Sequence, residues 1–167
     1  LIMDLPEGSI LTFIVMFILI MLSAFFSASE TAYTSFNRTK MKNLAAEGNK
    51  RAASALKLAE SYDKVLSTIL IGNNIVNIAS TSIATTLFVT LFGDAGAGIA
   101  TAVMTVLVLI FGEILPKTLA KSHAESFACG ISGIMSFLMT VFTPLSAIFI
   151  LLQKGANKLF ASKNKEV

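Results

Sequence analysis

Four long apolar blocks, separated by charged residues, dominate the pattern along the chain. They cover residues 9–37, 65–93, 95–116 and 126–153, and each contains at most one charged side chain. A helix needs about 20 apolar residues to cross a bilayer, and hydrocarbon requires the backbone to satisfy its hydrogen bonds internally. Each block therefore predicts a helix that is long enough to span a membrane.

The fourth block differs from the others because Pro144 interrupts it and obstructs one straight helix. After Pro144 the apolar and basic side chains separate onto different helix faces: Leu151, Leu152, Gly155, Leu159 and Phe160 near one, and Lys154 and Lys158 on another. This pattern is typical of a helix lying in the membrane interface. We therefore predict three spans, at about residues 9–37, 65–92 and 96–119, followed by a broken juxtamembrane helix at about 124–160.

The charges between the blocks predict an orientation. Residues 38–64 form a helix-prone connection rich in lysine and arginine, so the positive-inside rule places it in the cytoplasm. The N-terminal segment, with Asp4 and Glu7 and no base, and the short connection 93–98 are then outside. Bases after the third block return the chain to the cytoplasm. We expect a plasma-membrane protein with its N-terminus outside and its C-terminus cytoplasmic.

The overall composition supports this class of protein. Hydrophobic residues make up 54% of the 167 residues and charged residues only 14%, more apolar surface than a soluble domain of this length buries. The single Cys129 excludes an internal disulfide and a cysteine metal cluster. Anionic lipid headgroups explain the basic connection, so nucleic acid is not an expected partner. The expected fold is one all-α membrane domain over residues 1–167.

The first candidate motif is LSAFFSASETAY, residues 22–33, which places hydroxyls and a carboxylate in an apolar run. Ser23 and Ser27 are four residues apart and share a helix face, Glu30 lies near the same stripe, and Ser29 falls off it. The serines either bind an ion or only bond to their own helix and ease packing. Glu30 either takes part in a site or marks the helix end.

The second motif is LIGNNIVN, residues 70–77, inside the charge-free block. Gly72 permits close approach of another backbone. Asn73 and Asn77 share a face by their i, i+4 spacing, whereas Asn74 points elsewhere. The asparagines either join the helices by hydrogen bonds or offer carbonyl oxygens to a cation.

The third motif is FGEILPK, residues 111–117, at the end of the third block. Pro116 cannot donate a hydrogen bond to the carbonyl of Gly112, so the helix around Glu113 is expected to loosen and expose carbonyls. An ionised group inside a membrane is costly and normally marks an ion path. The alternative is that Glu113 forms an ion pair with Lys117, four residues on.

Ser27, Asn73 and Glu113 lie at comparable distances from the cytoplasmic connections, so three helices are expected to bring their oxygens to one level. An all-oxygen set suits magnesium, calcium or sodium and is poor for zinc or copper. His123, the only histidine, has no local partner, and no nucleophile–base pair is evident. We therefore expect the chain not to be an enzyme.

The motifs SAFFSASETA, IGNNIVNIA and FGEILPKTLAK, in this order and spacing, resemble the transmembrane domain of the CorC/CNNM (cyclin M) magnesium transporters. The resemblance covers essentially the whole chain. It implies three transmembrane helices with juxtamembrane helices, a homodimer, and sodium-coupled export of magnesium. It also implies ATP-binding cytoplasmic CBS domains in the full-length protein, which are absent from this chain.

Carried over residue by residue, the resemblance implies a Mg²⁺ site of Ser23, Ser27, Asn73 and Glu113, helped by backbone carbonyls near the helix breaks. Glu30 is then not a required ligand and serves either sodium coupling or a bond within the protein. The expected function is Na⁺-coupled Mg²⁺ efflux by alternating access, with Mg²⁺ as cargo and Na⁺ as coupling ion. The alternative is a membrane-embedded Mg²⁺ sensor or scaffold without transport activity of its own.

Overall fold

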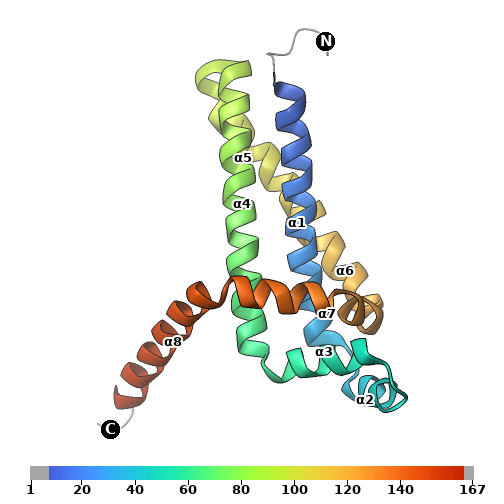
Figure 1. Ribbon diagram of the computed structural model, residues 1–167. Coiled ribbons are helices and arrows are strands. Elements are labelled where there is room, and N and C mark those ends of the chain that lie inside the picture. Colours follow the sequence, from blue (N-terminus) through green and yellow to red (C-terminus); the bar gives the residue numbers. More distant parts are fainter. Residues whose placement is uncertain (1–7, 164–167) are drawn as a thin grey trace.

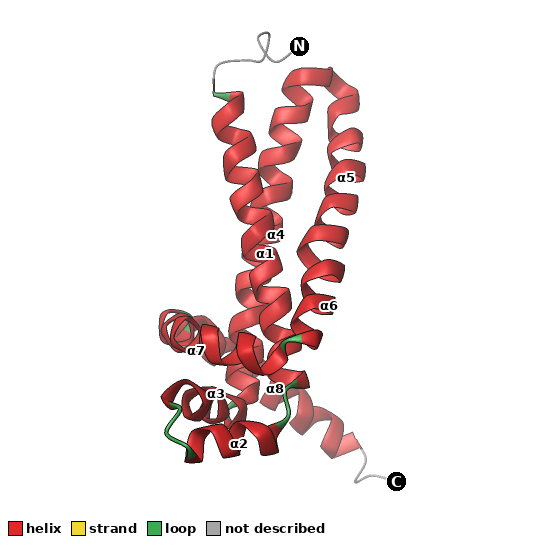
Figure 2. Cartoon of the chain, turned by 90° about the vertical axis from the view of Figure 1, so that its right-hand side faces the viewer, coloured by secondary structure: helices red, strands yellow, loops and turns green. Residues whose placement is uncertain are grey.

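The computed structural model describes residues 8–163, and every element within this range is helical (Figure 2). The helices are α1 (Ser9–Ser35), α2 (Arg38–Ala46), α3 (Lys50–Glu60), α4 (Tyr62–Phe92), α5 (Gly96–Leu107), α6 (Leu115–Ser122), α7 (Ala124–Val141) and α8 (Thr143–Lys163). A 3-10 turn, η1 (Gly93–Ala95), links α4 to α5, and a π-helix, η2 (Val108–Ile114), links α5 to α6. Asp4 and Glu7, on which the predicted outside location of the N-terminus rests, lie outside the described residues. The predicted all-α membrane fold is confirmed.

Helices α1, α4 and the continuous run α5–η2–α6 stand side by side, and α2, α3 and α7 gather at one end (Figures 1 and 2). Three helical stretches of the described chain are apolar and long enough to cross a membrane, namely α1, the run Tyr62–Ser122, and α7. The second stretch reverses at η1, so α4 and the α5–η2–α6 leg run antiparallel. In Figure 1, α7 lies crosswise to these upright helices, beside α2 and α3. The upright bundle therefore consists of α1, α4 and α5–η2–α6.

The outer face of the bundle is apolar. On α1 alone, large side chains more than 40% exposed are Ile10, Leu11, Phe13, Ile14, Phe17, Ile18, Met21 and Leu22. Such a surface suits lipid chains, which take the place of a protein core. The main packed core lies instead at the end where α1, α3 and α7 meet, around Ala32, Ala55 and Ala128. Small side chains at these fully buried positions let the crosswise helices approach the bundle closely.

The predicted break in the last apolar block occurs at Phe142, between α7 and α8, and Pro144 falls in the first turn of α8. Proline is tolerated there because the first backbone N–H groups of a helix have no partner within it. Beyond the break, α8 points away from the bundle (Figure 1). Its predicted apolar residues Leu151, Leu152, Leu159 and Phe160 are all exposed. This surface is available to a membrane or to another chain.

Candidate functional site

Ser23 and Asn73, two of the predicted site residues, meet between α1 and α4. The Ser23 hydroxyl donates a hydrogen bond of 3.0 Å to Oδ1 of Asn73. Ser23 is fully buried and Asn73 half-buried. A serine oxygen that donates its proton keeps its lone pairs, and an amide oxygen can accept a second interaction. The pair therefore offers oxygen acceptors at the contact between two helices.

The π-helix η2 approaches Ser23 from the third leg of the bundle. A Cβ added at Gly112 would lie 3.0 Å from the Ser23 Oγ atom, so glycine permits this close approach. The wide turn is visible in the bond from the Leu115 N–H to the carbonyl of Ile110, which spans five residues. Pro116 follows directly, and its missing N–H is the reason the sequence predicts a loosened helix here. Such π-turns occur frequently at functional sites.

Ser27 lies one turn after Ser23 on the same helix, and its hydroxyl is buried. The residue is 2% exposed, and its Oγ atom has no hydrogen-bond partner among the described residues. Ser29, in contrast, donates a bond of 2.6 Å to the carbonyl of Phe25. An unpaired buried hydroxyl is unfavourable unless a ligand or water satisfies it. Ser27 is thus free to bind a ligand, whereas Ser29 is satisfied by its own helix.

Glu113 projects into a neighbouring cavity of about 270 Å³ between α4 and the third leg. The side chain is half-buried, and it forms neither an ion pair nor a hydrogen bond with the described residues. The polar groups that share this cavity are Asn77, Thr81, Thr101 and Thr105. The structure therefore brings Ser23, Asn73 and Gly112 together. Glu113 instead lines a cavity with Asn77, and Asn73 does not line that cavity.

Asn77 is a candidate that the sequence analysis placed on the right face but did not include in the site. Its Oδ1 atom is buried and has no hydrogen-bond partner among the described residues. The hydroxyls of Thr101 and Thr105 donate to carbonyls one turn earlier, at 2.9 Å and 2.7 Å, and so offer only lone pairs to the cavity. The i, i+4 spacing of Asn73 and Asn77 is the sequence feature from which Asn77 could have been predicted as a site residue. This cavity suits a cation, because it presents a carboxylate and several acceptors.

Glu30 pairs with Lys117, so the predicted alternative of a Glu113–Lys117 ion pair is not found. The Lys117 Nζ atom lies 3.4 Å from Glu30 Oε2, and both side chains are partly exposed. The pair connects the end of α1 to α6. Glu30, for which the sequence left open sodium coupling or a bond within the protein, thus has a partner within the protein. Lys117 does not neutralise Glu113.

We predict that Glu30→Gln leaves the affinity for Mg²⁺ within about threefold of the original value. A partly exposed ion pair contributes about 0–1 kcal/mol, so the melting temperature should fall only slightly. Isothermal titration calorimetry and thermal melting of the purified protein measure the two effects. The charge-exchanged double variant Glu30→Lys/Lys117→Glu should recover the melting temperature. A loss of Mg²⁺ binding in Glu30→Gln would instead make Glu30 a ligand.

The donor chemistry of the whole region is oxygen. Among the described residues, no group of three or more His, Cys, Asp or Glu side chains gathers as a metal cluster. The available atoms are hydroxyls, amide oxygens and the single carboxylate of Glu113. Oxygen ligands are those that Mg²⁺, Ca²⁺ and Na⁺ prefer. A site with one carboxylate among neutral oxygens suits reversible binding of a hard cation.

A bundle of long apolar helices with buried oxygen ligands at their contacts defines a helical membrane protein. Comparison with known families specifies the class further. The profile described as "Cyclin M transmembrane N-terminal domain" matches residues 14–167, so the chain belongs to the CNNM family, as the three motifs predicted.

Several bacterial relatives are similar over most of this chain. A UPF0053 protein of Haemophilus influenzae is 42% identical over 90% of the chain and 36% of the relative. The UPF0053 inner membrane protein YfjD of Escherichia coli is 41% identical over 74% of the chain and 29% of the relative. The polyamine export protein of H. influenzae is 29% identical over 78% of the chain and 33% of the relative. The chain thus spans about a third of the length of these relatives.

Proposed function

We propose that the chain is the transmembrane domain of a transporter that exports Mg²⁺ in exchange for Na⁺ by alternating access. The observation that carries the proposal is the meeting of three legs of the bundle at one buried hydroxyl. Ser23 bonds to Asn73 of α4, and Gly112 of η2 packs against the same oxygen. Ser27, unpaired and buried, and Glu113, next to Gly112, complete a set of hard-cation ligands.

In this mechanism, Glu113 supplies the charge, and the neutral oxygens of Ser23, Ser27 and Asn73 replace water around the ion. The wide turn of η2 allows Glu113 to leave the cavity it shares with Asn77 and turn toward Ser23. An ion that binds only when these groups converge shifts the population toward that arrangement. Sodium entering the same oxygen-lined region supplies the opposing step. A near-octahedral arrangement of these oxygens at short distances would favour Mg²⁺ over the larger Ca²⁺.

We propose the orientation that the positive-inside rule favours for the lysine- and arginine-rich helices α2 and α3. With α2 and α3 in the cytoplasm, the ends of α1 and α4 next to them face the cell interior, and η1 faces outside. We further propose a plasma-membrane location, a homodimer, and regulation by cytoplasmic CBS domains in the full-length protein. The exposed apolar side chains of α1 and α8 offer surfaces for lipid and for a second copy. Catalysis is not part of this proposal.

A second candidate cargo is an organic polyamine. It is supported by the name of one relative, the polyamine export protein of H. influenzae, and by the Glu113 cavity. Ammonium groups only donate hydrogen bonds, and this cavity presents a carboxylate with the acceptor oxygens of Asn77, Thr101 and Thr105. The other polar residues that line this cavity along α4 and α5 are the uncharged Thr81, Thr101 and Thr105. Among the described residues, the cavity therefore offers no second carboxylate to the further ammonium groups of a polyamine, and it suits a compact cation better.

The experiment is a flux assay with the protein reconstituted in liposomes. We expect Mg²⁺ efflux, measured with an enclosed Mg²⁺-sensitive dye, that accelerates when Na⁺ is supplied on the opposite side. Movement of a radiolabelled polyamine without Mg²⁺ movement would support the second cargo. Movement of neither ion, with or without a Na⁺ gradient, would contradict transport and favour the sensor or scaffold alternative. Protein-free liposomes provide the leak rate.

A further inference from the structure

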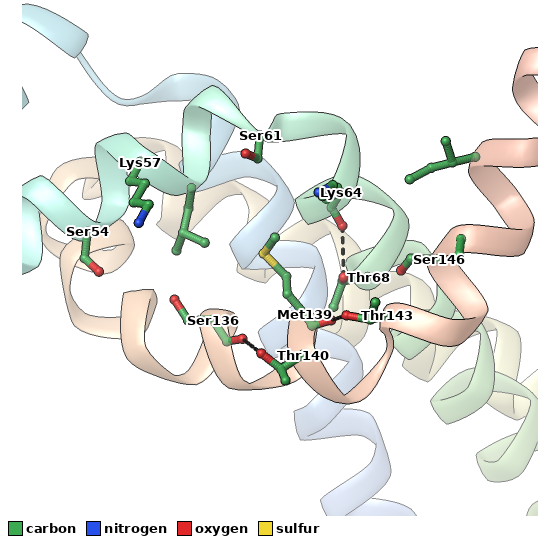
Figure 3. Close-up of a pocket in the computed structure, with 13 residues that line it drawn as sticks. Ser54, Lys57, Ser61, Lys64, Thr68, Ser136, Met139, Thr140, Thr143 and Ser146 are labelled. Atoms are coloured by element: carbon green, nitrogen blue, oxygen red, sulfur yellow. Dashed lines mark hydrogen bonds between the residues drawn. The ribbon is translucent and has the colours of Figure 1, made fainter.

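A second polar cavity, lined by no residue of the three motifs, lies where α3, α4, α7 and α8 meet (Figure 3). Its volume is about 560 Å³, twice that of the Glu113 cavity. Figure 3 shows Ser54 and Lys57 on the α3 side and Ser146 on the α8 side. The proposed cation transport uses none of these residues.

The hydroxyl groups that line this cavity fall into two sets. Those of Thr68, Ser136, Thr140 and Thr143 each donate to a backbone carbonyl one turn earlier, at 2.7–3.0 Å. Those of Ser54, Ser61 and Ser146 form no such bond among the described residues, and they remain available as donors. The free donors therefore come from α3, from the junction between α3 and α4, and from α8, around one space.

Ser146 is the most informative of these residues. It is only 6% exposed, and its buried Oγ atom has no hydrogen-bond partner among the described residues. In Figure 3 this hydroxyl projects from the start of α8 toward Thr68 of α4. A buried donor without a partner is unfavourable unless something in the cavity accepts its proton. The position of Ser146 thus indicates a ligand with an acceptor atom.

The charges around the cavity indicate an anion. Lys57 and Lys64 line it, and no carboxylate does. Neither lysine forms an ion pair within residues 8–163, where the two pairs found are Lys40–Glu125 and Lys117–Glu30. The carboxylates of Glu60 and Asp63 line the adjoining cavity instead. Two ammonium groups without an ion pair and three hydroxyls without an internal hydrogen bond can donate to a ligand in this cavity, which matches the acceptor-only oxygens of a phosphate.

The remaining wall is apolar. Leu58, Met139, Ala147 and Ile150 line the same cavity. From Ile150 the surface continues along α8 to the exposed Leu151 and Leu152. A ligand with an anionic end and an apolar body would place its phosphate at the lysines and its chains along α8. A phospholipid has this shape, and the positive-inside rule places these helices at the leaflet rich in anionic lipid.

We propose that the cavity between α3, α4, α7 and α8 binds a phosphate group, supplied by the headgroup of an anionic phospholipid or by free phosphate. Lys57 and Lys64 neutralise its charge, and Ser146 donates a hydrogen bond to it. The ligand would bridge α3 and α8, joining the basic cytoplasmic-side helices to the last helix of the domain. The site differs from the proposed cation site in position and in the sign of its ligand.

The test compares binding of two probes to the purified protein. One probe is phosphatidylglycerol in phosphatidylcholine nanodiscs, with retained lipid counted by native mass spectrometry after gentle release. The other is inorganic phosphate in detergent, measured by calorimetry. We expect Lys57→Gln and Ser146→Ala each to weaken binding roughly tenfold or more, because a hydrogen bond to a charged group is lost. Retention of phosphatidylglycerol alone assigns the phosphate to lipid, and binding of inorganic phosphate assigns it to a soluble source.

The matched controls are Lys50→Gln, on the same helix as Lys57 but outside the cavity, and Ser132→Ala. Ser132 is 3% exposed but donates to the carbonyl of Cys129 at 2.9 Å and does not line the cavity. Neither control should change binding. Equal binding by all variants, or no binding of either probe by the original protein, would overturn the proposal.

Thermal melting gives a second readout that does not depend on counting lipid. If Ser146 binds no ligand, Ser146→Ala removes an unsatisfied hydroxyl and should raise the melting temperature equally with and without phosphatidylglycerol. If the proposal holds, phosphatidylglycerol stabilises the original protein, and Ser146→Ala loses most of this added stability. If Ser146→Ala shifts the melting temperature equally with and without phosphatidylglycerol, the result would contradict the site even if the variants fold well.

Discussion

Glu113→Gln should abolish Mg²⁺ binding, with an affinity loss of more than about a hundredfold. Glu113 is the carboxylate among the proposed ligands, and no second carboxylate among the described residues lines its cavity and could take over its role. Removing a group that only supports a metal ligand already costs about 10–100-fold in metal affinity, so removing the charged ligand itself should cost more. Glutamine keeps the size of the side chain, which separates the loss of charge from a loss of packing.

Calorimetry with MgCl₂ and the liposome flux assay measure the effect on binding and transport. Glu60→Gln is the matched control, since Glu60 is an exposed carboxylate at the end of α3 and lies away from the site. Asn77→Ala tests the residue that the structure adds. If Glu113 moves between the Asn77 cavity and the oxygens around Ser23, Asn77→Ala should slow Mg²⁺ flux without changing the affinity for Mg²⁺. Unchanged Mg²⁺ affinity in Glu113→Gln would contradict the site assignment.

Much of the fold could be predicted because hydrophobic periodicity and charge placement are local properties of the sequence. Apolar blocks interrupted by bases predicted the helices, and Pro144 predicted the break before α8. The predicted first span ends at residue 37, whereas α1 ends at Ser35, because Asn37 caps α2 by accepting a bond from the Lys40 N–H. The fourth block is long enough for a span, but Pro144 and the pattern after it predicted a broken juxtamembrane helix instead. In the structure α7 packs crosswise against α1 and α3.

The sequence predicted which residues form the candidate site better than it predicted which of their side chains contact one another. The i, i+4 rule identified the faces that carry Ser23 and Ser27, and Asn73 and Asn77. It could not decide which partner each carboxylate meets, because that depends on the rotation of one helix against another. The extra residue in the π-turn of η2 shifts the faces of the third leg. Lys117 meets Glu30, and Glu113 lines the cavity beside Asn77, although the i, i+4 spacing left a Glu113–Lys117 pair open as an alternative.

Gly72→Ala should weaken both the fold and the site, because Phe26 occupies the space where a Cβ would lie. The Phe26 ring packs directly on Gly72, and a Cβ built there would overlap its outer carbon atoms. Phe26 is 5% exposed and lies between Ser23 and Ser27, while Gly72 directly precedes Asn73. Relief of the overlap must therefore move α1 away from α4 or displace the ring. Overpacking of this kind costs about 1–3 kcal/mol, and it should also lengthen the Ser23–Asn73 hydrogen bond.

Thermal melting and Mg²⁺ calorimetry of Gly72→Ala measure these two effects, and a double-variant cycle with Phe26→Leu identifies their cause. The smaller leucine makes room for the new methyl group, so the double variant should be more stable than the sum of the single changes predicts. Gly130→Ala is the matched control, since a Cβ there meets no atom within 4 Å and alanine is the better helix former. If Gly72→Ala melts like Gly130→Ala and binds Mg²⁺ normally, the contact between Phe26 and Gly72 does not hold the site together.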